Sequence, residues 1–544
     1  MLLEQSDKKL NRGGFLKRTW GKNLTILMLG IIITGCGEKS QETAKETKAY
    51  TFAVSTTVQS LDTKLAIDPT SQLVLNNVME GLYKLNAKGE IVPGGANGLP
   101  EISKDGLKYV IRLRKDAMWS NGTPVVADDY VYSWKRTLSN QDSPNIGFFE
   151  SIKNGKEIIS GTMKPDKLGV YAKDKNTLVI NLSTPIPYFT SMLINTAFFP
   201  QKQEVVEKEG DRYGTNSDSV IYNGPYILNS LKNTGISEKW KLKKNTKYWD
   251  SKSVRMNEID MNVIKDVGTG VSLFEAEKLD DVPLSGEYAK QNIKNDSFVS
   301  EVSDSALLLE VNHGNSKLNN IHLRRALSNA IDRKNLVHNV IANGSVPLTS
   351  ILTDSLKVSK EVTAGNYDLD RAKKELEIAK NELKQNNFTF DILTNDQDLG
   401  VKASEFIQGQ LNRLEGIKVN IVPVPATVQF DRLSKKEFDL SISGVAADYP
   451  DPFSILSNFR KNSPNNHGNY SSDKYEDFLN ESLKETDKNK RWKLLSKAEE
   501  TINSDLGVIP LLQLNNARLR NRNVIGITSN SVGPKYDFKY LNWK

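Results

Sequence analysis

The sequence predicts a globular protein of the α/β or α+β class, in which short strands alternate with amphipathic helices. Short runs alternate between apolar and polar residues with period two, and longer runs repeat their apolar residues at helical spacing. No repeat of about 20 to 50 residues indicates a solenoid or a propeller. With 544 residues, of which 38% are hydrophobic and 26% charged, the chain is long enough for two or three domains.

The clearest periodicity marks a small set of predicted strands and helices. The strands cover residues 50–54, 107–113 and 177–182. The helices cover residues 323–341, 367–385, 404–414 and 487–502. The first of these helices has one apolar face, made of Leu323, Ala326, Leu327, Ala330 and Ile331.

The N-terminal 35 residues have the pattern of a lipoprotein signal peptide. A basic stretch ends at Lys22, an apolar run follows over residues 24–33, and Cys36 comes directly after Gly35. The run is too short for a stable membrane span, which takes about 20 apolar residues. Cys36, the single cysteine of the chain, is therefore predicted to receive diacylglycerol and to become the new N-terminus. The alternative is a buried cysteine that happens to follow an apolar segment.

The lipid anchor predicts a tether and a location. Residues 36–49 carry the lipidated cysteine and a polar stretch without apolar periodicity, which favours a flexible linker. The body of the protein has no second cysteine, so a hydrophobic core must supply its stability without a disulfide. We expect the protein on the extracytoplasmic face of the cell membrane.

Charge and motifs exclude several classes of protein. The formal charge of the chain is +7, and residues 1–35 contribute +4 of it, with six basic and two acidic residues. The remaining residues carry +3, which is too small a charge to indicate nucleic-acid binding. The four histidines (His313, His322, His338 and His467) are scattered and have no zinc-ligand spacing. Neither a nucleophile elbow nor a phosphate-binding loop occurs. We expect no enzyme activity, no metal and no cofactor.

Residues 107–138 (LKYVIRLRKDAMWSNGTPVVADDYVYSWKRTL) combine a strand, a turn and a helix. On the residues alone, the stretch 120–124 (SNGTP) predicts the turn, Asp128 an N-cap, and Val131 and Trp134 one helical face. In its order and identity the stretch resembles the peptide-binding (oligopeptide-binding protein) family of ABC-transporter extracellular solute-binding lipoproteins. Further matches in family order cover nearly all of residues 50–544, at 61–62 (LD), 76–83 (NNVMEGLY), 185–189 (PIPYF), 222–226 (YNGPY), 248–250 (YWD), 323–333 (LRRALSNAIDR), 447–452 (ADYPDP) and 516–519 (NARL).

The resemblance implies a two-lobed, periplasmic-binding-protein-like α/β fold with a hinge and an extra N-terminal subdomain. The chain would cross between lobes near residues 303–307 and 510–515. The first lobe would comprise residues 50–304 and 515–544, with residues 79–203 as the extra subdomain, and the second lobe residues 305–514. The implied partners are oligopeptides and the permease subunits of an ABC transporter, and we expect a monomer.

The family holds its peptide as an extended strand between the lobes, so the resemblance also implies a set of ligand-binding residues. The backbone-pairing residues here would be Ala66, Ile67 and Asp68 on one side, and Gly444, Val445 and Ala446 on the other. Asp448 would hold the α-ammonium group of the peptide; its alternative is a turn-forming role beside Tyr449 and Pro450. Asn223 and Glu310 would also contact the ligand, with a tight-turn cap and a surface residue as the respective alternatives.

Several positions depart from the well-known oligopeptide-binding members. The aligned residues here are Val445 and Ala426 in place of tryptophan, Leu433 and Ile442 in place of arginine, and Leu514 in place of tyrosine. These changes make the predicted pockets less polar and favour hydrophobic peptides, with a peptide pheromone as a permissible ligand. A one-residue shift of the alignment would instead place Arg432 in the role given to Leu433.

Two other functions stay open on the sequence. The first is a solute-binding protein for a non-peptide ligand such as nickel, haem or a sugar, and the small number of histidines argues against the metal. The second is an extracytoplasmic chaperone or enzyme on the same fold, for which no residue gives positive support.

Overall fold

The largest sheet of the protein combines strands from the beginning, middle and end of the chain. The computed structural model describes residues 48–357 and 365–544. The predicted signal peptide (1–35), Cys36 and the tether as far as residue 47 lie outside the described residues. The sheet contains β1 (Tyr50–Val54), β8 (Tyr226–Asn229), β9 (Lys239–Lys244), β10 (Glu258–Val263), β11 (Asp281–Leu284), β12 (Phe298–Val311), β13 (Val346–Pro347), β14 (Phe388–Asn395), β15 (Ile417–Val424), β16 (Leu440–Ala446) and β17 (Val508–Arg520).

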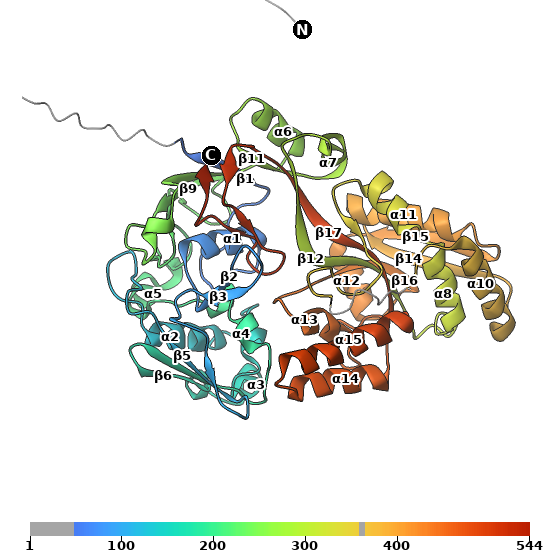
Figure 1. Cartoon of the computed structure of the whole chain (residues 1–544), viewed down its shortest axis with the longest axis horizontal. Coiled ribbons are helices and arrows are strands. Elements are labelled where there is room, and N and C mark those ends of the chain that lie inside the picture. Colours follow the sequence, from blue (N-terminus) through green and yellow to red (C-terminus); the bar gives the residue numbers. More distant parts are fainter. Residues whose placement is uncertain (1–47, 358–364) are drawn as a thin grey trace, which may run out of the picture. The chain divides into compact units, whose positions relative to one another are not determined.

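The order of these strands is β15-β14-β16-β12-β17-β11-β1-β10-β9-β8, and β13 also pairs with β17. The two longest strands, β12 and β17, lie side by side at the centre of this order and run antiparallel (Figure 1). Their ladder holds as far as Val302 opposite Asn515 and resumes with Ala306 opposite Gln513, so its register shifts between these points. Both predicted crossings, at 303–307 and 510–515, include part of this irregular stretch. The division of the chain into lobes at these residues stays a prediction.

Asp304 holds the irregular stretch of β12 in place. Its side chain is buried and accepts hydrogen bonds from Thr353 Oγ1, at 2.6 Å, and from the hydroxyl of Ser355. Its backbone carbonyl accepts a hydrogen bond from the N–H of Ala447, at 2.8 Å. The irregular stretch of β12 is therefore joined directly to the segment that follows β16.

A second sheet lies within the predicted subdomain of residues 79–203. It has the order β4-β5-β7-β6, formed by β4 (Glu101–Ile102), β5 (Lys108–Arg112), β7 (Thr177–Asn181) and β6 (Val170–Asp174). Helix α2 (Ala127–Leu138) packs against it and buries Tyr130 and Trp134 completely. The prediction that Asp128 caps the helix is wrong, because the N-cap residue is Val126 and the capping carboxylate belongs to Asp129, three residues later. Asp128 is exposed, and the buried carboxylate of Asp129 accepts the N–H of Val126, at 3.0 Å, and the indole N–H of Trp119, at 2.9 Å.

The remaining helices and short strands cover the sheets or connect them. The helices are α1 (Pro69–Val78), α3 (Gly155–Ile159), α4 (Phe189–Met192), α5 (Gln203–Glu209), α6 (Val267–Glu275), α7 (Gly286–Asn292), α8 (Ile321–Ala330), α9 (Arg333–Asn335), η6 (Leu336–Ile341), α10 (Leu369–Leu383), α11 (Asp398–Leu411), α12 (Ala426–Ser434), α13 (Pro452–Leu456), α14 (Asp473–Lys484) and α15 (Lys488–Ser504). The short strands are β2 (Tyr83–Leu85), β3 (Ile91–Pro93), β18 (Val524–Ile525), β19 (Thr528–Ser529), β20 (Tyr536–Asp537) and β21 (Asn542–Trp543). Among the described residues, no helix has both the length and the apolar character needed to cross a membrane.

Most of the predicted elements are confirmed. The three predicted strands are β1, β5 and β7, and three of the predicted helices are α10, α11 and α15. The predicted single helix over 323–341 is wrong, because the chain breaks after Ala330 and resumes as α9 and a π-helix, η6. The buried guanidinium of Arg333 donates to the carbonyls of Pro510, at 2.6 Å, and Ser328, at 3.1 Å. A contact made with a distant strand thus replaces the continuous helix.

A buried ionic cluster joins β1, β11, β12 and β17. Asp281 is fully buried and accepts hydrogen bonds from the guanidinium groups of Arg518 and Arg520. Tyr50 donates its hydroxyl to Asp281, at 2.8 Å, and Arg520 pairs with Glu301, at 2.7 Å. Burial alone would lower the pKa of Arg518 and Arg520, but the neighbouring carboxylates raise it well above its usual range. Each charge in this cluster is therefore matched by an opposite one.

Candidate ligand-binding site

Over residues 443–446, one edge of strand β16 is not covered by any strand of the described residues. It pairs antiparallel with β12 over its whole length, from Ser305 opposite Ala446 to Val311 opposite Leu440. On the other side it pairs with β14 only at Leu440 and Ser441. The side-chain amide N–H of Gln429 donates a hydrogen bond to the carbonyl of Ile442, at 2.7 Å. Within the described part of the chain, residues 443–446 therefore keep one edge free, and Gly444 and Ala446 are exposed there.

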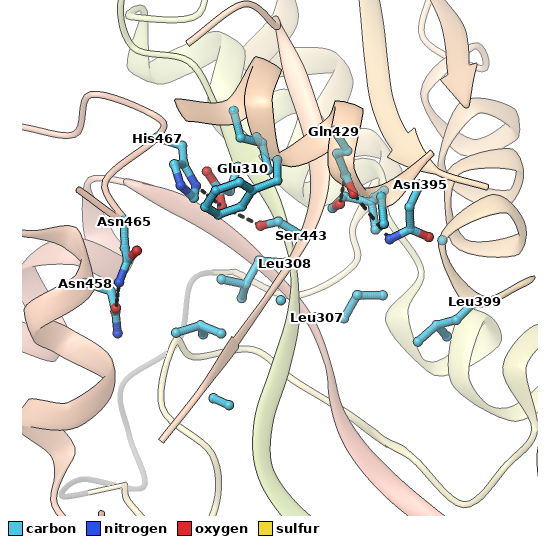
Figure 2. Close-up of a pocket in the computed structure, with 18 of the residues that line it drawn as sticks. Leu307, Leu308, Glu310, Asn395, Leu399, Gln429, Ser443, Asn458, Asn465 and His467 are labelled. Carbon is cyan, nitrogen blue, oxygen red and sulfur yellow. Dashed lines mark hydrogen bonds and ion pairs between the residues drawn. The ribbon is translucent and has the colours of Figure 1, made fainter. Parts of the chain in front are cut away.

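A cavity of about 470 Å³ opens at this free edge (Figure 2). Its size falls in the range of about 300–1,000 Å³ typical of ligand pockets. It is lined by Leu307, Leu308 and Glu310 of β12; Ala426, Gln429, Phe430 and Leu433 of α12; Ile442, Ser443, Gly444, Val445 and Ala446 of β16; Asn395, Gln397, Leu399 and Gly400; and Asp448, Asn458, Phe459, Asn465 and His467.

Many of the predicted ligand-binding residues line this pocket. They are Glu310, Ala426, Leu433, Ile442, Gly444, Val445, Ala446 and Asp448. The alternative alignment, which would put Arg432 in the place of Leu433, does not fit the structure. Leu433 is buried against the pocket, whereas Arg432 is exposed and donates to the carbonyl of Glu437, at 3.0 Å. Contact of any of these residues with a ligand stays a prediction.

The other predicted ligand-binding residues do not line the pocket. Ala66 is buried, Ile67 is 58% exposed, and Leu514, on β17, packs against a buried apolar cluster. Asp68 caps helix α1 by accepting the N–H of Ser71, at 2.8 Å.

Asn223 also lies away from the pocket, and its side chain braces the backbone of Glu80. It accepts the N–H of Glu80, at 3.0 Å, and donates to the Glu80 carbonyl, at 2.9 Å. Both ends of the amide are therefore in use, and the structure supports the capping alternative for this residue.

Asp448 lies two residues after the end of β16 and lines the pocket. Its own N–H donates to Ser454 Oγ, at 2.8 Å, but its carboxylate accepts no hydrogen bond from any described residue. The surrounding protein raises the pKa of this carboxyl above its ordinary value by desolvation.

The turn-forming role expected as the alternative for Asp448 belongs to Asp451. The carboxylate of Asp451 caps helix α13 by accepting the N–H of Phe453, at 3.0 Å. It also makes a two-pronged ion pair with the buried Arg491, at 2.7 and 2.8 Å. The turn is thus held by Asp451, and Asp448 has no structural partner of this kind.

The polar wall of the pocket is formed around Glu310. The hydroxyl of Ser443 donates to this carboxylate, and Nδ1 of His467 lies 3.5 Å from Oε1 (Figure 2). The side chain of Glu310 is only 7% exposed, so the alternative that placed it on the surface is wrong. The ring of Phe430 stands edge-on to His467, with centroids 6.4 Å apart, and is 64% exposed.

Sequence reasoning missed several of these residues. Phe430 and Gln429 lie one helical turn from Ala426 and Leu433, so the helical spacing of α12 was a signal that could have found them. His467 had no such signal, because 157 residues separate it from Glu310. In the described part of the chain, no group of three histidine, cysteine or acidic residues is arranged to hold a metal ion.

An aromatic stack joins the predicted subdomain to the segment after β16. The ring of Tyr188 stacks on Tyr449 with centroids 4.8 Å apart and an angle of 5°, and on Phe453 at 5.1 Å. The guanidinium of Arg491 lies 5.5 Å from the centre of the Tyr188 ring. The residues on either side of Asp448 are therefore fixed by hydrogen bonds and stacking.

Comparison with known proteins connects this site to a family. The family model described as bacterial extracellular solute-binding proteins, family 5 Middle, matches residues 90–467. The dipeptide-binding protein of Lactococcus lactis subsp. cremoris is 30% identical over 549 residues, which cover 95% of this chain and 98% of that protein.

Two solved structures extend the comparison to the fold. The pheromone receptor PrgZ, whose mode of peptide binding is known, matches with a TM-score of 0.73 and 39% identity over 91% of this chain and 99% of that chain. OppA of Listeria monocytogenes bound to peptide matches with a TM-score of 0.70 and 33% identity, again over 91% and 99%. The predicted two-lobed α/β fold is confirmed by these neighbours. The chain belongs to family 5 of the bacterial extracellular solute-binding proteins.

Proposed function

We propose that the protein is an extracellular peptide-binding lipoprotein that delivers oligopeptides to an ABC importer and catalyses no reaction. The observation that carries the proposal is the free edge of β16, which ends at the unpartnered carboxylate of Asp448. Relatives described as dipeptide-binding and oligopeptide-binding proteins support a peptide as the ligand.

The free edge suits an extended peptide of any sequence. Every residue of a peptide except proline offers the same N–H and C=O, so pairing with residues 443–446 would not depend on side chains. Residues 66–68 would pair with the other side of the peptide. Of these, Ile67 leaves an apolar side chain 58% exposed, which is consistent with a surface that a ligand covers.

Asp448 suits the amino terminus of that peptide. A buried ammonium group needs a counter-charge, and a carboxylate without other donors can supply it through a charge-assisted hydrogen bond. Because Asp448 lies two residues beyond the C-terminal end of β16, the amino terminus of the peptide would lie at that end. The peptide would therefore run antiparallel to β16.

The side chains of the pocket favour apolar peptides. Leu433 and Ile442 line it where the well-known family members carry arginine, and Val445 replaces a tryptophan. Leu307, Leu308 and the exposed ring of Phe430 add apolar surface. A hydrophobic signalling peptide belongs to this class, and one similar protein is described as a pheromone receptor.

Cys36 would anchor the protein to the extracytoplasmic face of the cell membrane. The basic stretch, the apolar run and the cysteine after Gly35 support this anchor. Cys36→Ser should leave peptide binding intact while the protein is released or remains an unprocessed precursor. Cell fractionation that finds the variant still acylated and membrane-bound would contradict the anchor.

Native mass spectrometry of the protein with a peptide mixture tests the proposal as a whole. We expect intact peptides of mixed sequence to be retained. Retention of a non-peptide ligand alone, or the appearance of cleaved peptides, would favour one of the other functions. Asp448→Asn is the control, because it should retain fewer free-amine peptides from the same mixture.

A further inference from the structure

The backbone at Asp448 is held in place by bonds that leave its carboxylate unused. The N–H of the preceding residue, Ala447, donates to the carbonyl of Asp304 in the irregular stretch of β12, at 2.8 Å. The N–H of Asp448 itself donates to Ser454 Oγ, at 2.8 Å. These two bonds fix the chain up to Asp448, and the direction of its side chain then depends on the residue that follows.

That following residue, Tyr449, is held by a side chain from a distant part of the sequence. The ring of Tyr188 stacks on Tyr449, with centroids 4.8 Å apart, and on Phe453, with centroids 5.1 Å apart. The guanidinium of Arg491 lies 5.5 Å from the centre of the Tyr188 ring. Tyr188 therefore packs against the residue next to Asp448, although it does not line the pocket itself.

The predicted subdomain presents Tyr188 from a rigid position. The next residue, Phe189, is fully buried and meets Tyr109 of β5 with ring centroids 5.1 Å apart. The carbonyl of Tyr188 accepts the N–H of Ser191, at 2.9 Å. Tyr188 is thus fixed to the core of the subdomain, while Tyr449 belongs to the segment after β16.

The charges around the stack leave Asp448 as the group that needs a partner. Arg491 pairs with Asp451, at 2.7 Å, so this cation is already matched by an acid. Burial raises the pKa of the Tyr449 hydroxyl well above its ordinary value, and the neighbouring Tyr188 raises it further. The hydroxyl stays protonated at neutral pH. Within residues 447–453, Asp448 is therefore the charge for which the described residues supply no opposite one.

We infer that Tyr188 is a positioning residue for the amino-terminal anchor: by stacking on Tyr449, it holds the carboxylate of Asp448 in the direction that receives the α-ammonium group of the peptide. The inference rests on the proposed function and adds that the subdomain contributes to peptide affinity without touching the amino terminus. A hydrogen bond weakens steeply when its donor and acceptor are misaligned, and a charge-assisted bond has more affinity to lose. Freedom of motion at Tyr449 therefore weakens the contact made by Asp448.

Peptide titrations on variants of Tyr188 test this inference. Tyr188→Leu removes the stacked ring, whereas Tyr188→Phe keeps the ring and removes only the hydroxyl. For a leucine- and valine-based peptide with a free amino terminus, Tyr188→Leu should weaken binding by about three- to tenfold, which is the contribution of one aromatic pair. The N-acetylated form of the same peptide should change by less than about twofold, because it makes no ionic contact with Asp448. Tyr188→Phe should bind both peptides as the unmutated protein does.

Two controls separate positioning from general damage. Tyr171→Leu makes the same substitution elsewhere in the subdomain, at a tyrosine of β6 that is 46% exposed, and should leave both affinities unchanged. Tyr188→Leu combined with Asp448→Asn should bind the free-amine peptide no more weakly than Asp448→Asn alone, because both changes act on one contact. Circular dichroism checks the folding of each variant. Tyr188→Met fills the same space without a ring and takes its place in the titrations if Tyr188→Leu does not fold.

The other outcomes count against distinct parts of the argument. Equal weakening of the free-amine and acetylated peptides in Tyr188→Leu would overturn the inference, because the stack would then support the fold and not the direction of Asp448. A further loss in the double variant would overturn it as well. In both cases the proposed function would stand. If acetylation were harmless in the unmutated protein, the amino-terminal anchor would fail and the inference with it.

Discussion

Two groups of acidic residues in this protein have opposite surroundings. At the junction of β11 and β17, Asp281 is paired with Arg518 and Arg520. In the pocket, Asp448 accepts no hydrogen bond from any described residue, and Glu310 has no described lysine or arginine beside it. A paired acid stabilises the fold while its partner is present, whereas an unpaired acid raises the free energy of the empty protein. The comparison distinguishes acids that hold the sheet together from acids that are available to a ligand.

Removal of the paired acid should have the largest effect on stability. Asp281→Asn leaves two buried guanidinium groups with less negative charge beside them, so we expect the free energy of unfolding to fall by about 3–5 kcal/mol. Urea denaturation measures this loss. Arg522→Ala is the control, because Arg522 pairs with Asp296 at 2.7 Å while their side chains are 63% and 77% exposed. It should change stability by no more than about 0.5 kcal/mol, and equal losses in both variants would contradict the comparison.

The two acids of the pocket, Asp448 and Glu310, should also affect which peptides bind. A leucine side chain buried in the pocket contributes about 1.5–3 kcal/mol, whereas a glutamate there would meet Asp448 or Glu310 without a cation between them. Peptides of equal length in which leucine is replaced by glutamate at one interior position should bind about tenfold more weakly or worse at that position. Calorimetric titration of the two series provides the measurement. Acidic peptides that bind as tightly as the leucine series would show that the pocket carries a counter-charge.

The smallest expected effect concerns the stability of the empty protein. Desolvation raises the pKa of Asp448, so the folded protein retains a proton that the unfolded chain releases between the ordinary aspartate pKa and the raised one. The contribution of this residue to stability therefore falls as the pH rises through that interval. Asp448→Asn should be at least as stable as the unmutated protein at neutral pH, and the difference should vanish at acidic pH. A variant less stable at neutral pH would indicate a structural partner for Asp448.

Local pattern was enough to predict the elements whose periodicity is strong. Strand β1 and helix α10 depend on their own residues and on one buried face, so they lie where the pattern predicts them. The helix expected over 323–341 fails because Arg333 bonds to the carbonyl of Pro510, which is 177 residues away. The sequence alone also could not show whether Asp128 or Asp129 accepts the backbone N–H at the start of α2.

The candidate site shows the same limit. Family resemblance, and not composition, placed Asp448 and Gly444 at the pocket, and Leu433 follows from the same alignment. The contact between His467 and Glu310 depends on a loop folding back over β12, which no local pattern indicates. Asn223 was ambiguous for a physical reason, because an asparagine that braces a backbone and one that binds a ligand occur in the same kind of turn.

Calorimetric titration of a free-amine peptide and its N-acetylated counterpart, against the unmutated protein and against Asp448→Asn, tests the central claim most directly. The claim is that an unpaired carboxylate at the end of a free strand edge anchors a peptide. Acetylation should weaken binding to the unmutated protein by about 2–5 kcal/mol and have much less effect in the variant, because the two changes remove the same contact. If acetylation proves harmless in the unmutated protein, Asp448 does not hold the amino terminus and the claim is wrong.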